Sequence, residues 1–166
     1  MVNHFGDFLV RTKTKRIMDK IRVAVVGYGN IGKFAVEAVQ AAKDMELAGV
    51  VRRSTAGCVP VELTGVKIVS NIDDLGKVDV AILCGPSRSV PEIAKEIVGK
   101  GICTVDSFDI HGDALWELHE MLDAECKKNN VASVISAGWD PGSDSVIRTL
   151  LMAMAPKGIT YTNFGP

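Results

Sequence analysis

The stretch "IRVAVVGYGNIGK", residues 21–33, decides the fold. It begins with a nearly continuous β-branched run, which is the pattern of a strand buried on both faces. Gly27, Gly29 and Gly32 then match G-x-G-x-x-G directly before a segment with helical periodicity. The first glycine of this pattern permits a tight turn, the second lets the backbone approach a pyrophosphate, and the third lets helix and strand pack closely. The stretch therefore predicts a strand, a dinucleotide-binding turn and a helix.

A second phosphate-binding pattern overlaps this turn. Residues 27–33 also fit G-x-x-x-x-G-K, the loop of nucleotide hydrolases. In that loop Ser or Thr follows the lysine and holds magnesium, whereas Phe34 follows it here and cannot bind a metal. We therefore reject the hydrolase interpretation. The alternative that stays open is that the glycines serve a tight turn without a ligand.

The rest of the chain alternates strand and helix patterns. Helices are expected after the glycine turn, after Ser89 in a capping box with Glu92, and at 113–128 and 144–155. Further strands are expected at 46–51, 67–70, 78–85, 102–108, 131–136 and 159–164. This alternation predicts an α/β fold with a doubly wound, parallel, Rossmann-type sheet.

The helices should bury apolar stripes. In the first, the stripe consists of Ile31, Phe34, Ala35, Ala38, Val39 and Ala42. In the helix at 113–128 it consists of Leu115, Leu118, Leu122 and Cys126. In the last helix it consists of Val146, Ile147, Leu150, Leu151 and Met154.

An arginine pair stands where many dinucleotide-binding domains carry an acidic residue. That residue lies about twenty positions beyond the glycines and accepts hydrogen bonds from the ribose hydroxyls of NAD. Here the strand at 46–51 leads into Arg52, Arg53 and Ser54. Arginine attracts a phosphate, often through two N–H groups. The sequence therefore predicts that the 2′-phosphate of NADP binds here, unless the arginines are only solvated loop charges.

Composition narrows the class of protein. The chain has 166 residues, 47% hydrophobic and 23% charged, with a net charge of -1, which suits one folded domain and gives no electrostatic footprint for nucleic acid. No apolar run is long enough to span a bilayer. The cysteines at 58, 84, 103 and 126 show no CxxC spacing, and the histidines at 4, 111 and 119 show no metal-ligand pattern. We expect free thiols, no metal site and a cytoplasmic location.

The first twenty residues differ from the rest. They mix charged and polar residues without periodicity, and their basic residues follow the short apolar patch, the wrong order for a signal peptide. We expect a disordered leader or a peripheral helix over residues 1–20.

Polar residues gather where three of the predicted strands end. The segments are "CGPSRS" (84–89), "VDSFDIH" (105–111) and "SAGWDPG" (136–142). Ligands of doubly wound sheets lie beyond the carboxyl ends of the strands. Aspartates there suit a cationic substrate group such as an amine, although Asp109 and Asp140 could instead cap a helix or a turn.

Five segments, taken in order, resemble meso-diaminopimelate dehydrogenase: "VAVVGYGNIGK", "VVRRS", "LCGPS", "CTVDSFDIH" and "AGWDPG". Their order and spacing match across residues 21–166, and "VDSFD" followed by "GWDPG" is quite specific. The resemblance implies reversible, NADP-dependent oxidative deamination of the D-centre of meso-2,6-diaminopimelate (DAP). The products are L-2-amino-6-oxopimelate and ammonia, in lysine and DAP metabolism.

The resemblance also implies residue roles. Asp109 and Asp140 would be the catalytic pair that binds the reacting D-amino end, with Trp139 and Phe164 beside the substrate. Cofactor contacts would fall on three segments and on the nicotinamide side of the site. They are Gly27, Tyr28, Gly29, Asn30, Ile31 and Gly32; Arg52, Arg53 and Ser54; Cys84, Gly85, Pro86 and Ser87; and Ser107, Phe108, Ala137, Gly138, Trp139 and Pro141.

The family continues beyond the final "NFGP" into a domain that holds the far end of the substrate and makes much of the dimer contact. We therefore expect residues 21–166 to be an NADP-binding domain with the start of the substrate site, without the substrate and dimerisation domain. We also expect a homodimer or other self-association. Two alternatives remain: a catalytically inert NADP-binding domain, and another two-domain NADP dehydrogenase acting on an amino acid.

Overall fold

The computed structural model describes residues 20–54, 59–139 and 142–158, in two compact units divided between Cys84 and Gly85. The first unit carries β1 (Ile21–Val26), α2 (Asn30–Ala41), β2 (Met45–Val51), η1 (Val61–Leu63), β3 (Ile68–Val69), η2 (Ile72–Leu75) and β4 (Val80–Leu83). The second carries η3 (Ser87–Ser89), α3 (Val90–Gly99), β5 (Cys103–Asp106), α4 (Asp113–Asn129), β6 (Ser133–Val134) and α5 (Ser143–Met154).

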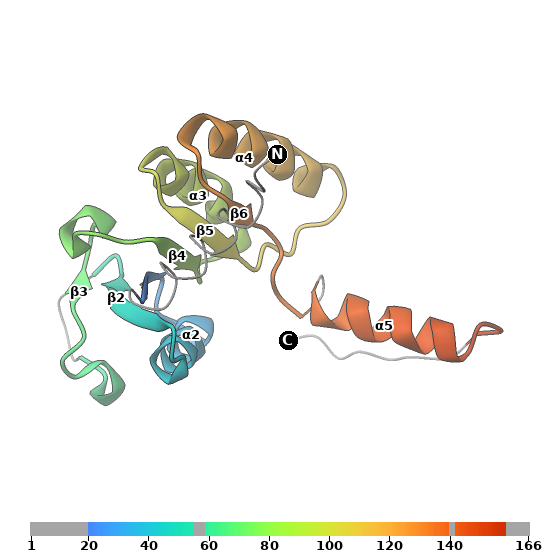
Figure 1. The fold of residues 1–166 in the computed structure, drawn as a ribbon, viewed down its shortest axis with the longest axis horizontal. Helices are drawn as coiled ribbons and strands as arrows, with labels where there is room; N and C mark the ends of the chain where they lie inside the picture. The colour runs from blue at the N-terminus through green and yellow to red at the C-terminus, as the bar shows by residue number, and fades with distance from the viewer. Residues whose placement is uncertain (1–19, 55–58, 140–141, 159–166) are drawn as a thin grey trace, which may run out of the picture. The chain divides into compact units, whose positions relative to one another are not determined.

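The strands pair in parallel, in the order β3-β2-β1-β4 in the first unit and β5-β6 in the second (Figure 1). This order of parallel strands with intervening helices is that of a Rossmann-type fold. The predicted fold class is confirmed. The predicted strand at 159–164 lies outside the described residues.

The core of the first unit lies between α2 and the sheet. Val25, Val36, Val50 and Leu63 form its centre, and the ring of Tyr28 packs against them. The buried face of α2 is Gly32, Val36 and Val39, at helical spacing. Ile31 and Phe34, predicted for the apolar stripe, are instead 58% and 65% exposed.

This error in the stripe has a steric cause. An ideal Cβ on Gly32 would lie 2.2 Å from the backbone oxygen of Gly27, so α2 meets the strand at its glycine. The helix is therefore rotated toward a residue without a side chain. Ile31 and Phe34 flank that line of contact and stay outside.

In the second unit, α3 and α4 pack against each other and against β5 and β6, respectively (Figure 1). Leu118, Leu122 and Cys126 are buried on α4 as predicted, and Leu115 is half-buried. The capping box at Ser89 is wrong. Its backbone is already helical, with φ -97° and ψ -10°, and its hydroxyl donates to the oxygen of Pro86 at 2.8 Å.

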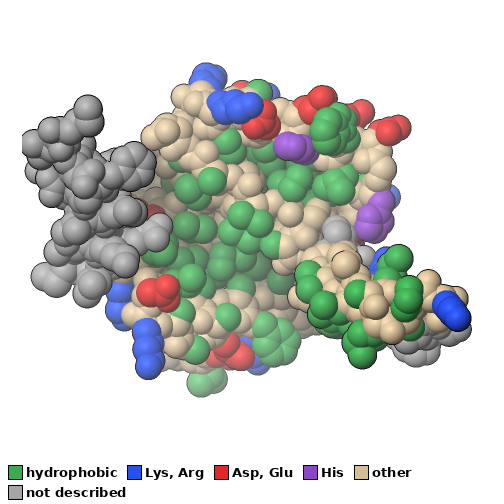
Figure 2. Space-filling model, turned by 45° about the vertical axis from the view of Figure 1, so that its right-hand side comes forward, with side chains coloured by type: hydrophobic (Ala, Val, Ile, Leu, Met, Phe, Trp, Pro, Cys, Tyr) green, Lys and Arg blue, Asp and Glu red, His purple; other side chains and the backbone are tan. Residues whose placement is uncertain are grey.

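The helix α5 forms at the predicted place, but its apolar side is not covered by described residues. Val146 is 61% exposed, Leu150 59% and Met154 81%, and Figure 2 shows hydrophobic side chains along this helix. Asp144 is the buried residue of α5. The predicted apolar stripe therefore exists as a surface rather than as part of a core.

Candidate functional site

The glycine turn has the geometry that its sequence predicts. Gly27 has a φ of 96°, in the left-handed region that favours glycine. Gly32 has no room for a side chain, as shown above. Gly29 differs, because its backbone is extended and an ideal Cβ there would meet nothing within 4 Å. The fold itself therefore requires glycine at positions 27 and 32 but not at 29.

The N-terminus of α2 is available to a ligand. Gly29 is its N-cap residue and offers no side-chain cap. The first N–H groups of a helix point outward with the positive end of the helix dipole, which suits an anion. There is free space at Gly29, and the N–H groups in the first turn of α2 have no side-chain cap. Both features fit the binding of a pyrophosphate.

The arginine pair lies next to this turn. The N–H of Gly27 donates to the oxygen of Val51 at 2.8 Å, and the N–H of Arg52 donates to the oxygen of Val69 at 2.9 Å. The first bond joins the glycine turn to the residue just before the arginines, and the second fixes Arg52 against β3. Among the described residues, no carboxylate pairs with Arg52 or Arg53. The backbone of Arg52 is thus fixed at the carboxyl end of the sheet, beside the turn, and Arg53 follows it.

Lys33, the other cation near the turn, already has a partner. Its Nζ lies 3.2 Å from Oε1 of Glu62. A backbone hydrogen bond at Glu62 and then the Lys33 ammonium lower the pKa of the Glu62 carboxyl. Because this carboxylate neutralises Lys33, the arginine pair carries the positive charge available to a phosphate.

Cys84 lies on the other side of the turn. Its N–H donates to the oxygen of Val26 at 2.7 Å, so the carboxyl end of β4 lies beside the carboxyl end of β1. Burial raises the pKa of the Cys84 thiol to about 11. The thiol is therefore protonated at neutral pH, and Cys84 behaves as a small, uncharged side chain beside the turn.

In the second unit, Ser87 and Asp109 are in contact although 22 residues separate them. The Ser87 hydroxyl donates to Oδ1 of Asp109 at 2.5 Å, and the Asp109 N–H donates back to the Ser87 Oγ at 3.3 Å. The segments 84–89 and 105–111, both singled out by sequence, therefore meet through these two side chains.

Asp106 joins the segment after β5 to the segment after β6. Its Oδ1 accepts the N–H groups of Phe108 at 2.9 Å and Ser136 at 3.1 Å, and its backbone oxygen accepts the N–H of Ala137 at 2.7 Å. The Ser136 hydroxyl donates to the oxygen of Phe108 at 2.8 Å. Asp106 is buried, and its Oδ2 has no hydrogen-bond partner within the described ranges.

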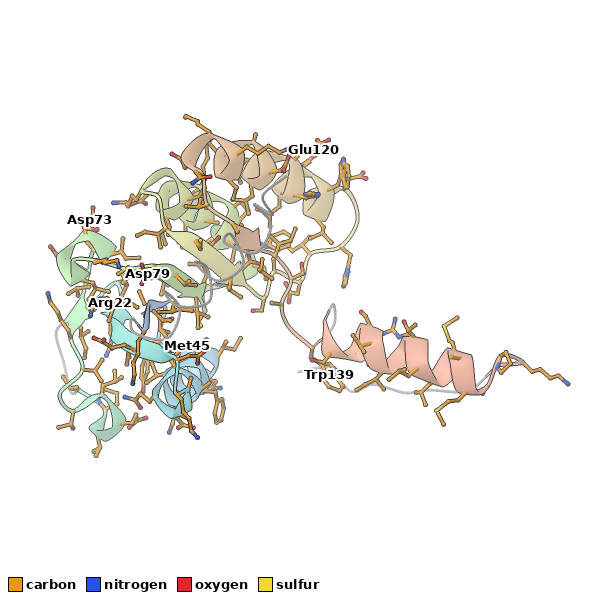
Figure 3. All side chains as sticks on the ribbon, in the orientation of Figure 1. Arg22, Met45, Asp73, Asp79, Glu120 and Trp139 are labelled. Carbon is orange, nitrogen blue, oxygen red and sulfur yellow. The ribbon has the colours of Figure 1, made fainter. Side chains whose placement is uncertain are left out.

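The predicted residues around Trp139 are described in part. Phe108 is buried, Ser107 and Gly138 are half-buried, and Ala137 is exposed. Trp139 is 49% exposed and lies just before α5 (Figure 3). The N–H of Asp144 donates to the oxygen of Trp139 at 2.7 Å, which closes the turn into α5. Asp140, Pro141 and Phe164 lie outside the described residues.

Sequence reasoning missed two residues of this site. The sequence places Asp106 only among the aspartates that suit a cationic group, and it assigns no role to Ser136. The sequence carries little information on these two roles, because a short polar residue after a strand can have many different partners.

The structure also contains a cavity of about 780 Å³ between α4 and β6, lined by His119, Cys126 and Ser133 among others. It contains none of the predicted site residues.

The glycine turn, the uncapped start of α2 and the parallel strands around them define a dinucleotide-binding domain of the Rossmann type. Residues 21–136 match the oxidoreductase family with an NAD-binding Rossmann fold, and the chain belongs to this family. No helix within the described residues is long and apolar enough to cross a membrane.

The chain is similar in sequence to the meso-diaminopimelate D-dehydrogenase of Bacteroides fragilis. The two are 59% identical over 149 residues, which cover 90% of this chain and 50% of the relative. The chain thus spans about half the length of the curated relatives that it matches most fully.

Solved structures show the same likeness. The C. glutamicum DAP dehydrogenase in complex with DAP has a TM-score of 0.69 and 30% identity, over 82% of this chain and 41% of that one. An engineered D-amino acid dehydrogenase bound to NADP+ has a TM-score of 0.67 and 30% identity, over 81% and 41%.

Proposed function

We propose that residues 21–166 form the NADP-binding domain of a DAP dehydrogenase, together with the start of its substrate site. The observation that carries the cofactor part is the bond between Gly27 and Val51, because it holds the arginine pair beside the phosphate-binding turn. The substrate part is supported by the names of the relatives and by the Ser87–Asp109 contact. The cytoplasm is the proposed location.

Each part of the site has a proposed task. The backbone of Gly27–Gly32 binds the pyrophosphate, and Arg52, Arg53 and Ser54 bind the 2′-phosphate. Residues 84–86, Ser107, Phe108, Ala137, Gly138 and Pro141 border the nicotinamide, which supplies the hydride acceptor when NADP is bound.

The carboxylates have a separate task. Asp109 and Asp140 hold the reacting amino group, with Trp139 and Phe164 beside the substrate. Holding this group fixes the α-carbon, and a misplacement of about 1 Å at the reacting centre can cost roughly a hundredfold in rate.

The cofactor proposal is tested by titrating the chain with NADP and with NAD, using fluorescence or calorimetry. Charge-assisted hydrogen bonds contribute about 1.5–3 kcal/mol each, so two arginines predict a preference for NADP of at least about tenfold. Arg53→Ala should reduce that preference, because it removes one of the two arginines. Lys95→Ala, which deletes an exposed cation on α3, is the matched control and should leave it unchanged. Equal affinity for both cofactors would contradict the proposal.

A second candidate is an NADP-binding module that needs further polypeptide for catalysis. It is favoured by the length of the match, about half of each such relative. Under this candidate the 166-residue chain binds NADP, self-associates and shows no measurable oxidation of DAP. A steady-state assay with DAP and NADP tests this candidate, because saturable turnover by the chain alone excludes it.

A further inference from the structure

We infer that Ser87 is a positioning residue for Asp109: it occupies one carboxylate oxygen and thereby turns the other toward an ammonium group of the substrate. This inference rests on the proposed function and deepens it. Ser87 was predicted to contact the cofactor. Its observed hydrogen bonds indicate a different task.

The hydroxyl of Ser87 makes two hydrogen bonds with Asp109, one as donor and one as acceptor. A serine hydroxyl has one hydrogen to donate, and that hydrogen goes to Oδ1 of Asp109. The Ser87 Oγ in turn accepts the N–H of Asp109. The side chain therefore has no donor left for a cofactor phosphate or carboxamide, and both of its bonds fix the same residue.

The two partners are held on rigid supports. Ser87 begins η3, where the N–H and the hydroxyl of Ser89 both donate to the oxygen of Pro86, at 2.9 and 2.8 Å. Asp109 follows Phe108, whose side chain is buried and whose N–H is bound by Asp106. The Ser87–Asp109 contact thus joins two fixed points, so the carboxylate orientation is set before any ligand arrives.

Asp109 keeps one oxygen for a ligand. The residue is exposed, and in the part of the chain that the structure describes its Oδ2 accepts no hydrogen bond. A carboxylate oxygen accepts hydrogen bonds and attracts a cation, so the ligand group that fits is a protonated amine. Without Ser87 the carboxylate could rotate, and binding would then include the entropy of ordering it.

The experiment compares ligands with and without the amine. The NADP-saturated chain is titrated by calorimetry with DAP and with pimelate, the same diacid without amino groups. Ser87→Ala is expected to weaken DAP binding about tenfold and to leave pimelate and NADP binding unchanged. Ser87→Thr, which keeps a hydroxyl, should restore DAP binding. Ser145→Ala, which removes an exposed hydroxyl on α5 in the same unit, is the matched control.

A double-mutant cycle with Asp109→Asn adds a second criterion. If Ser87 acts through Asp109, Ser87→Ala should have little further effect on DAP affinity once Asp109 has been changed. Equal DAP affinity of Ser87→Ala and the unchanged protein overturns the inference and leaves the proposed function intact. So does an equal loss for DAP and pimelate. Failure of the unchanged, NADP-loaded chain to bind DAP overturns the proposed substrate and this role of Ser87 together.

Discussion

Asp106 Oδ1 accepts the backbone N–H of Ser136 at 3.1 Å, across 30 residues of sequence. The same oxygen accepts the N–H of Phe108, so one buried atom fixes two segments that end at the candidate site. A buried acceptor of this kind acts on stability and on site geometry at once.

Removing that acceptor should destabilise the protein. Asp106→Ala leaves two N–H groups without their partner, at about 1–3 kcal/mol for each buried donor, so we expect a loss of at least about 2 kcal/mol in the free energy of unfolding. Asp106→Asn keeps the Oδ1 acceptor and should lose much less. Urea unfolding measures both variants. Equal stability of Asp106→Ala and the unchanged protein would show that the Oδ1 bonds do not hold the two segments.

Gly29 and Gly32, the second and third glycines of the turn, should respond differently to substitution by alanine. Gly32→Ala places a methyl group against the backbone oxygen of Gly27 and should cost about 1–3 kcal/mol or more. Gly29→Ala meets no neighbour, so the melting temperature should stay the same while NADP affinity falls at least about tenfold. Thermal unfolding and cofactor titration on the same samples make the comparison. Unchanged NADP binding by Gly29→Ala would argue that no pyrophosphate approaches this backbone.

Cys84 gives a pH-dependent prediction. Because burial raises its pKa from 9.0 to about 11, the folded state keeps the thiol proton between these values while the unfolded state releases it. The folded state binds more protons there, so stability should fall as pH rises from 9 to 11. Cys84→Ala should make this fall in stability smaller, measured by urea unfolding. At pH 8 only about a thousandth of the thiol is thiolate, so iodoacetamide should modify Cys84 after unfolding rather than before.

The exposed side of α5 should drive self-association. Val146, Leu150 and Met154 recur every four residues and form one apolar face. Leu150→Lys should shift the chain toward monomer in light scattering over a range of concentrations. Thr149→Lys adds the same charge at the adjacent exposed position and should have a smaller effect. A monomer that does not change with concentration in the unchanged protein would refute the prediction.

The β1-turn-α2 unit was predictable because its information is local. Gly27 needs a left-handed φ and Gly32 needs a close approach, and both needs appear as glycine spacing. The buried face of α2 was not predictable from apolar periodicity, since the contact point is a residue with no side chain. Apolar periodicity counts side chains, so it does not identify Gly32 as the contact residue.

The contacts of the second unit depend on tertiary structure. The Ser87–Asp109 and Asp106–Ser136 bonds join segments 22 and 30 residues apart, and no local pattern specifies which hydroxyl meets which carboxylate. The prediction of a capping box at Ser89 was wrong for the same reason, since it also depended on local sequence alone. Its sequence fits a capping box, but a short helical turn precedes α3 and gives its hydroxyl another acceptor.

Ser136 has a φ of 57°, which costs a residue with a Cβ roughly 1 kcal/mol. Glycine there would relieve that strain but would remove the hydroxyl that donates to Phe108. Because such a hydrogen bond contributes about 0.5–1.5 kcal/mol, the two effects nearly cancel in the free energy of unfolding. Ser136→Gly should therefore change stability little while it frees the backbone of Phe108. A thermal screen would pass over this position, although its side chain joins two segments of the candidate site.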